Sequence, residues 1–114
     1  MSITVIDYGS GNLKSAAKAL ETAANNININ SKIVVTSDPK EIKQSDKIVL
    51  PGQGSFRDCY SSIKKIPGLN ETLNEFVIEK KKPILGICVG MQLFAKNGYE
   101  SQETKGFGWI NAEV

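Results

Sequence analysis

Cys88 is the residue of this chain that is best placed to act as a nucleophile. It lies in Gly86-Ile87-Cys88-Val89-Gly90, directly after a short apolar run that follows Pro83. This spacing matches a nucleophile elbow with Cys in the place of Ser, in which small residues let a strand turn sharply into a helix. We therefore expect Cys88 at a helix N-terminus, where partial positive charge favours the thiolate, with the backbone N–H of Val89 facing the same space. The alternative is a buried Cys at the end of a core strand, because free Cys is among the most buried residue types.

Two further glycine-rich turns follow predicted strands. Pro51-Gly52-Gln53-Gly54 comes after one apolar run, and Tyr8-Gly9-Ser10-Gly11-Asn12 comes after another. Ligands of an open parallel sheet bind beyond the carboxyl ends of its strands, so we expect the Pro51–Gly54 loop and Cys88 at one edge. The first turn could cradle a phosphate at a helix N-terminus, although Lys14 takes the place of the third glycine of the dinucleotide pattern. The other interpretation is a strand-to-helix turn that needs two small residues.

The sequence contains no histidine and only two cysteines. A Cys–His pair, a His general base and a His-based metal site are therefore excluded within this chain. Two cysteines do not make a disulfide framework, and the cytoplasm is the default compartment. Cys59 falls on the apolar face of a predicted helix, which favours a packing role. We expect no metal and no cofactor.

Composition bounds the remaining function classes. The 114 residues suffice for one small domain, and the net charge of +2 gives no reason to expect nucleic acid as a ligand. No apolar run reaches membrane-spanning length, and the N-terminus lacks the layout of a signal peptide. We interpret Lys80-Lys81-Lys82 as the solvated end of a helix.

Hydrophobic periodicity and turn residues predict alternating strands and helices. The predicted strands are residues 3–6, 32–36, 47–50, 84–87 and 109–114, and the predicted helices are residues 13–24, 39–44, 55–66, 70–79 and 89–97. Asp38, Ser55 and Asn70 are the expected N-caps, and Gly98 is expected to end the last helix. The strand at residues 84–87 is expected to be buried on both faces. The pattern predicts an α/β fold with a mostly parallel sheet and helices on both faces.

Three segments resemble the class I (triad-type) glutamine amidotransferases, and among them the glutaminase subunits of imidazole glycerol phosphate synthases. The most discriminating segment is Ile6–Ser15, which is similar to the N-terminus of those subunits. Leu50–Gly54 is similar to their oxyanion strand, and Gly86–Gln92 is similar to their nucleophile elbow. The closing stretch Gly106–Ile110 also fits. The resemblance extends over all 114 residues in order, and it implies a flavodoxin-like amidotransferase domain.

The resemblance implies hydrolysis of glutamine to glutamate and ammonia, with Cys88 as the nucleophile that forms a glutamyl thioester. The backbone N–H groups of Gln53 and Val89 would form the oxyanion hole, and Gly52 with the side chain of Gln92 would hold glutamine. The turn formed by Tyr8, Gly9, Ser10, Gly11 and Asn12 would face a barrel-type synthase subunit, which uses the ammonia in histidine biosynthesis.

This sequence departs from the family pattern in two places. Gln53 stands where family members often have Val. The exchange is tolerated because the group that the site needs here is a backbone N–H. The triad His and Glu of the family follow much later, so residues 1–114 are expected to be the N-terminal portion of one amidotransferase domain whose C-terminal half is absent. We expect the chain as given to be inactive alone. The alternatives are a non-catalytic binding module of the same fold, an amidotransferase serving pyridoxal phosphate, purine or aminobenzoate synthesis, and a flavodoxin-like nucleotide binder.

Overall fold

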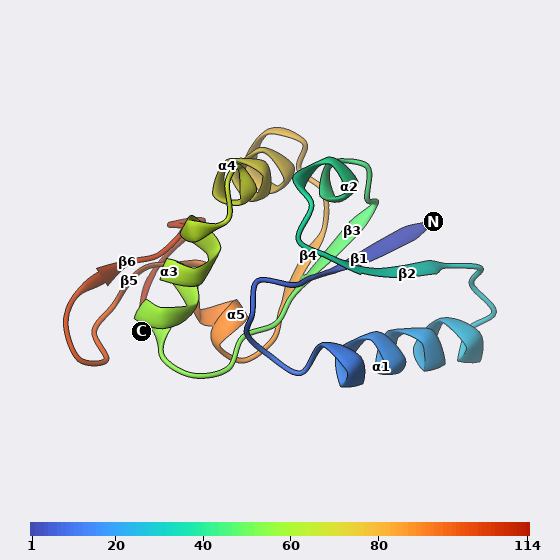
Figure 1. Cartoon of the computed structure of the whole chain (residues 1–114), viewed down its shortest axis with the longest axis horizontal. Helices are drawn as coiled ribbons and strands as arrows, with labels where there is room; N and C mark the ends of the chain where they lie inside the picture. Colours follow the sequence, from blue (N-terminus) through green and yellow to red (C-terminus); the bar gives the residue numbers. More distant parts are fainter.

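The computed structural model describes residues 1–114 and contains two sheets (Figure 1). The larger sheet has four parallel strands in the order β2-β1-β3-β4. In the smaller sheet, of order β6-β5-β7, strand β5 pairs antiparallel with β6 and parallel with β7. The strands are β1 Ser2–Ile6, β2 Lys32–Thr36, β3 Lys47–Leu50, β4 Ile84–Gly86, β5 Ala95–Gly98, β6 Thr104–Lys105 and β7 Ile110–Glu113. Each strand predicted from the sequence overlaps one of these, whereas β5 and β6 were not predicted.

Helices lie on both faces of the larger sheet. They are α1 Leu13–Asn26, α2 Pro39–Lys43, α3 Phe56–Lys65, α4 Leu69–Asn74, the π-helical turn η1 Glu75–Glu79 and α5 Val89–Gln92. Helix α1 lies along one face, and α2 and α4 lie on the other (Figure 1). The predicted α/β class with a parallel sheet between helices is therefore confirmed. None of the helices combines the length and the apolar character that a membrane crossing requires.

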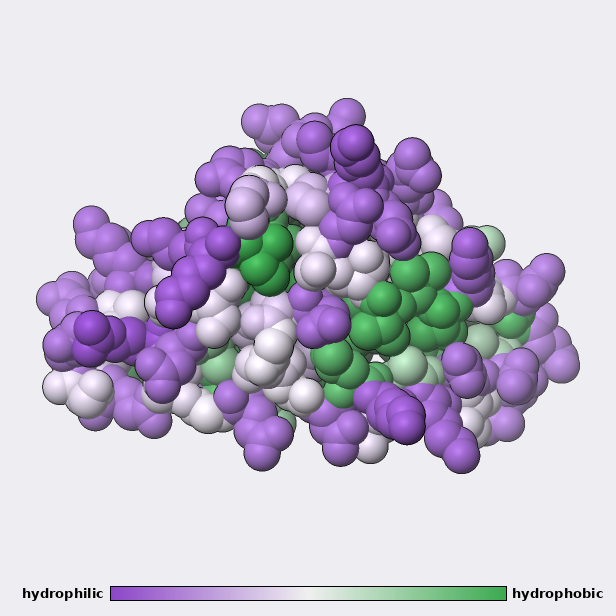
Figure 2. Space-filling model, in the orientation of Figure 1, coloured by the Kyte–Doolittle hydropathy of each residue, from purple (hydrophilic) through white to green (hydrophobic).

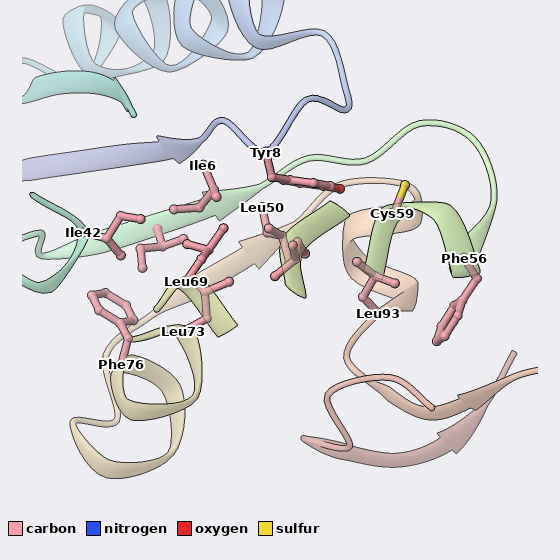
Figure 3. Close-up of a cluster of buried hydrophobic side chains, with 12 residues drawn as sticks. Ile6, Tyr8, Ile42, Leu50, Phe56, Cys59, Leu69, Leu73, Phe76 and Leu93 are labelled. Carbon is pink, nitrogen blue, oxygen red and sulfur yellow. The ribbon is translucent and has the colours of Figure 1, made fainter. Parts of the chain in front are cut away.

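The hydrophobic core fills the space between the larger sheet and helices α2, α3 and α4 (Figure 3). Ile6, Ile48 and Leu50 contribute from the strands, and each is at most 1% exposed. Burying a side chain of this size contributes about 1.5–3 kcal/mol relative to leaving it in water. Because residues alternate between the faces of a strand, these side chains fix which residues of β1 and β3 face the helices. Cys59 of α3 belongs to the same cluster and is 2% exposed, so its predicted packing role is confirmed.

The opposite face of the sheet is only partly covered. Register pairs place Val35, Val5, Val49 and Leu85 in one row across the four strands. Helix α1 packs against β1 and β2, and β4 forms an edge that pairs only with β3. Leu85 is consequently 56% exposed, so the expectation of a strand buried on both faces is wrong. Figure 2 shows further hydrophobic surface where β1 and β2 run between α1 and α2.

The predicted helix over residues 89–97 is also wrong in its second half. Helix α5 ends at Gln92, and Ala95–Gly98 forms the central strand of the smaller sheet. Gly98, which was expected to end the helix, instead packs on the Phe56 ring, where an added Cβ would lie 2.7 Å from a ring carbon. Pairing with two strands supplies hydrogen bonds that a continued helix would have to supply locally, and this tertiary context overrides helix propensity.

Two of the three predicted N-caps are confirmed. The Asp38 side chain accepts a hydrogen bond from the backbone N–H of Lys40 at 3.0 Å, and Ser55 accepts one from Asp58 at 3.1 Å. The third prediction is wrong because α4 begins at Leu69, so Asn70 lies inside the helix and Gly68 occupies the cap. Leu69 is fully buried, and its burial draws the cap two residues earlier, from Asn70 to Gly68.

Candidate active site

Cys88 occupies the turn between β4 and α5, as the glycine spacing predicted. The Cys88 backbone has φ +54° and ψ −124°, and the residue is exposed. A positive φ costs a non-glycine residue of the order of 1–3 kcal/mol and persists where the surroundings enforce it. The alternative of a buried structural Cys is therefore excluded. Helix α5 has only four residues, so its dipole at Cys88 is smaller than that expected from a longer helix.

The two glycines of the elbow are required by close backbone packing. A Cβ added to Gly90 would collide with the carbonyl oxygen of Leu50, and one added to Gly86 would collide with the backbone of Met91. The N–H of Ile87 donates to the same Leu50 carbonyl at 3.0 Å, which extends the β3–β4 pairing up to the nucleophile. The end of β3 therefore determines where the Cys88 residue is held.

The Pro51–Gly54 loop faces Cys88, as predicted. A Cβ added to Gly52 would lie 2.5 Å from the backbone nitrogen of Gly90, so the loop backbone lies directly on the first turn of α5. A cleft of about 480 Å³ lies between this loop, Cys88 and the start of α1. It is lined by Gly11, Asn12, Ser15, Ala16, Pro51, Gly52, Gln53, Ile87 and Cys88. Cys88 thus shares one cleft with the Pro51–Gly54 loop and with the start of α1.

The turn Tyr8–Asn12 supports this loop from the side of β1. The Tyr8 hydroxyl donates a hydrogen bond of 2.5 Å to the carbonyl oxygen of Pro51, and Figure 3 shows its ring reaching from the end of β1 toward α3. Burial, and then the neighbouring Cys59, raise the pKa of Tyr8 well above its ordinary value, so the phenol stays protonated. Tyr8 is only 4% exposed, so its side chain packs inward and offers little surface to a partner. The turn's remaining residues, 9–12, are at least partly exposed.

The two amides that were predicted to form an oxyanion hole differ in their present partners. The N–H of Val89 opens the first turn of α5, where a helix leaves its N–H groups without intrahelical acceptors. The N–H of Gln53 instead donates to the Ser10 hydroxyl at 2.9 Å, and the Gln53 carbonyl accepts from the same hydroxyl at 2.8 Å. The Gln53 peptide is therefore tied to the Tyr8–Asn12 turn in this conformation.

Gln92 lies outside the Cys88 cleft. It lines a neighbouring pocket of about 340 Å³ together with Phe56, Gly98, Tyr99, Glu100 and Val114. The Glu100 carboxylate accepts a hydrogen bond from the N–H of Phe56 at 3.1 Å, and Glu100 is the only residue with a carboxylate side chain that lines either space. Sequence reasoning missed Glu100 because it stands alone in a polar connection, without a motif around it. No signal in the sequence marks it, because only the folded chain brings Glu100 beside Gln92.

Comparison with known proteins agrees with this geometry. The family model described as "Glutamine amidotransferase class-I" matches residues 4–107. A protein of Pelagibacter ubique (strain HTCC1062), named imidazole glycerol phosphate synthase subunit HisH, is 53% identical over 115 residues. Proteins with the same name from Rhodopseudomonas palustris and Brucella suis are 48% and 47% identical over 114 residues.

Each of these alignments covers 100% of this chain and 53% of the relative. The chain thus spans about half the length of the curated relatives it matches. The matched region nevertheless contains the elbow, the Pro51–Gly54 loop and the Tyr8–Asn12 turn. The chain therefore belongs to the class I glutamine amidotransferase family.

Proposed function

We propose that this chain is the nucleophile-bearing N-terminal portion of the glutaminase subunit of an imidazole glycerol phosphate synthase. The observation that carries the proposal is the exposed Cys88 at a strained strand-to-helix turn, sharing one cleft with the Pro51–Gly54 backbone. Its relatives of 47–53% identity carry the name of a synthase subunit, which supports assigning the chemistry to such an assembly.

The proposed reaction begins with attack of the Cys88 thiolate on the side-chain amide carbon of glutamine. The S–C bond forms as the carbonyl π electrons move to oxygen, and the N–H groups of Val89 and Gln53 stabilise that oxyanion. The C–N bond then breaks, and ammonia leaves with a proton supplied by a general acid. Water hydrolyses the thioester to glutamate and regenerates the thiol. The base and acid lie outside these residues, because the sequence contains no histidine.

This reaction sets a requirement on Gln53. Its N–H now donates to Ser10, so the peptide has to leave that acceptor before it can stabilise an oxyanion beside Cys88. The N–H of Val89 has no such requirement. The two proposed donors therefore differ in how ready they are for catalysis.

The substrate glutamine would lie between the cleft and the neighbouring pocket. Its ammonium group requires a negatively charged partner, which Glu100 supplies, and Gln92 in the same pocket can hydrogen bond to its polar groups. Gly52 lines the Cys88 cleft, where its backbone packs directly on the first turn of α5 and is available for hydrogen bonds to the substrate. The exposed residues Gly9–Asn12 remain the proposed contact with a barrel-type synthase subunit. In this view the assembly is a cytoplasmic heterodimer and a lyase.

A binding titration tests the substrate assignment without requiring turnover. Adding L-glutamine to the ¹⁵N-labelled chain should shift the backbone resonances of Gly52, Gln92 and Glu100. Glu100→Gln removes the charge but keeps the shape, so it should weaken binding about tenfold or more. Glu103→Gln, a nearby carboxylate outside both spaces, serves as the matched control. Unchanged affinity in Glu100→Gln would contradict this part of the proposal.

A further inference from the structure

A basic pocket of about 340 Å³ lies where α3 meets β6, separate from the Cys88 cleft. It shares no lining residue with that cleft or with the pocket that contains Gln92. Four of its seven lining residues are basic, and none is acidic. The lining consists of Arg57, Tyr60, Ser61, Lys64 and Lys65 of α3 and of Thr104 and Lys105 of β6. Hydrophilic surface covers these two elements (Figure 2).

Helical spacing places the α3 residues of this pocket on one face of the helix. Arg57, Ser61 and Lys65 follow one another at intervals of four, and Tyr60 and Lys64 form a second row beside them. The two lysines lie in the last turn of α3, where they complement the negative end of the helix dipole. Arg57 lies in the first turn, where a cation is unfavourable. Helix stability therefore does not account for the whole arrangement.

The pocket concentrates the positive charge of the chain. Four of the 14 basic residues line it, so the remaining ten are outnumbered by the 12 acidic residues elsewhere. Glu103, directly before β6, lies toward Tyr99 and does not line the pocket. Burial raises the pKa of Tyr60, so its phenol adds no negative charge. Because like charges repel at close range, an anion bound among these cations relieves their repulsion.

Packing holds the wall of the pocket in place. The Tyr60 ring meets the Phe107 ring edge-on with centroids 5.0 Å apart, and its hydroxyl donates to the Asn70 side chain at 3.4 Å. The Lys64 ammonium lies 5.5 Å from the centroid of the Tyr60 ring, in a cation–π contact. The Thr104 hydroxyl donates a long hydrogen bond of 3.5 Å to a neighbouring backbone carbonyl, which a closer acceptor in the pocket can replace. A fixed aromatic wall thus positions a cation beside an open polar space.

We propose that this pocket binds a small molecule through phosphate groups that carry at least two negative charges. The Arg57 guanidinium can donate two parallel hydrogen bonds to a pair of phosphate oxygens, and the lysines supply point charges. Four cations exceed what a carboxylate or another monoanion neutralises, which favours a multiply charged ligand. One helix face and one two-residue strand bound the pocket, which favours a compact ligand over an extended nucleic acid. The proposal does not depend on the glutaminase assignment, because the two sites share no residue.

Calorimetric titration with inorganic pyrophosphate tests the proposal. The buffer is free of phosphate and metal ions and contains about 0.15 M NaCl, which screens long-range attraction. Arg57→Gln should weaken binding about tenfold and Lys105→Gln about threefold, because a bidentate charged pair is stronger than a single point charge. Lys80→Gln removes the same charge from the exposed Lys80–Lys82 run and should leave the affinity unchanged. Equal weakening in Lys80→Gln and Lys105→Gln would indicate attraction to net charge alone and would overturn the proposal.

Backbone resonances of the ¹⁵N-labelled chain locate the bound anion. Pyrophosphate should shift the resonances of residues 57–65 and 104–105 and leave those of residues 80–82 in place. Acetate, a monoanion, should bind at least about tenfold more weakly than pyrophosphate. No detectable binding at about 1 mM pyrophosphate would refute the site. A single-stranded oligoribonucleotide that binds the same residues more tightly than pyrophosphate would refute the assignment to a small ligand.

Discussion

Gly90→Ala is the substitution for which local propensity and the structure predict opposite results. Gly90 lies in α5, and replacing a helical Gly by Ala normally stabilises by up to about 1 kcal/mol. Here the added Cβ would collide with the Leu50 carbonyl oxygen and lie 2.9 Å from the Pro51 carbonyl carbon. Both obstacles are backbone, and the Leu50 carbonyl is held by the Ile87 N–H, so no side chain can move aside.

Overpacking of this kind costs about 3 kcal/mol at the upper end of its usual range, which leaves a net loss of about 2 kcal/mol after the propensity gain. At about 4 °C per kcal/mol for a domain of this size, Tm should fall by about 8 °C. Thermal unfolding followed by circular dichroism measures this. Gly54→Ala is the comparison, because its Cβ would meet no atom within 4 Å and its cost comes from a positive φ alone. We expect a smaller loss there, about 1 kcal/mol. A Tm for Gly90→Ala equal to or above the wild type would refute the packing argument.

Four further outcomes are expected. Asp38→Ala should lower the free energy of unfolding by about 1 kcal/mol, because its side chain caps α2, and chemical denaturation measures the loss. The isolated chain should self-associate through the exposed β4 edge, and Leu85→Lys should shift light scattering toward monomer; a monodisperse wild type at high concentration would contradict this. The pKa of Tyr8 is raised in the folded chain, so the contribution of its protonated phenol to the free energy of unfolding should be fully present below about pH 10 and decrease as the pH rises beyond it. In Tyr8→Phe the free energy of unfolding should decrease less over the same pH range. The purified chain should release no ammonia from glutamine, because it has no histidine; steady release in a coupled assay would show that another group acts as base.

Local signals were sufficient for the parts of the fold that depend on nearby residues. Runs of β-branched residues located the four parallel strands, and Asp38 with Pro39 located the start of α2. The glycines around Cys88 predicted the elbow because their spacing is a local pattern, although the contact that requires Gly90 is with the distant Leu50 backbone. The sequence did not indicate which distant segments pair as strands. Ala95–Gly98 has no strand composition, and it becomes a strand because two other segments pair with it.

The candidate site likewise has features that could be predicted from the sequence and features that depend on long-range contacts. The nucleophile and the facing loop could be predicted, since both follow strands of one parallel sheet. The state of the Gln53 amide could not, because its acceptor is Ser10, 43 residues away in the sequence. Glu100 was likewise missed, since only the folded chain brings it beside Gln92. Exposure of Leu85 depends on which strand forms the edge, which the residues of β4 alone do not determine.

Covalent labelling with a diazoketone analogue of glutamine tests the central claim most directly. The proposal predicts an adduct on Cys88, identified by peptide mass spectrometry, whose formation is slowed by added L-glutamine but not by L-leucine. Cys59, which is 2% exposed, should stay unmodified in the folded chain and react only after unfolding. Equal modification of the two cysteines in the folded chain, or labelling of Cys88 that glutamine does not slow, would contradict the assignment of this cleft as a glutaminase site.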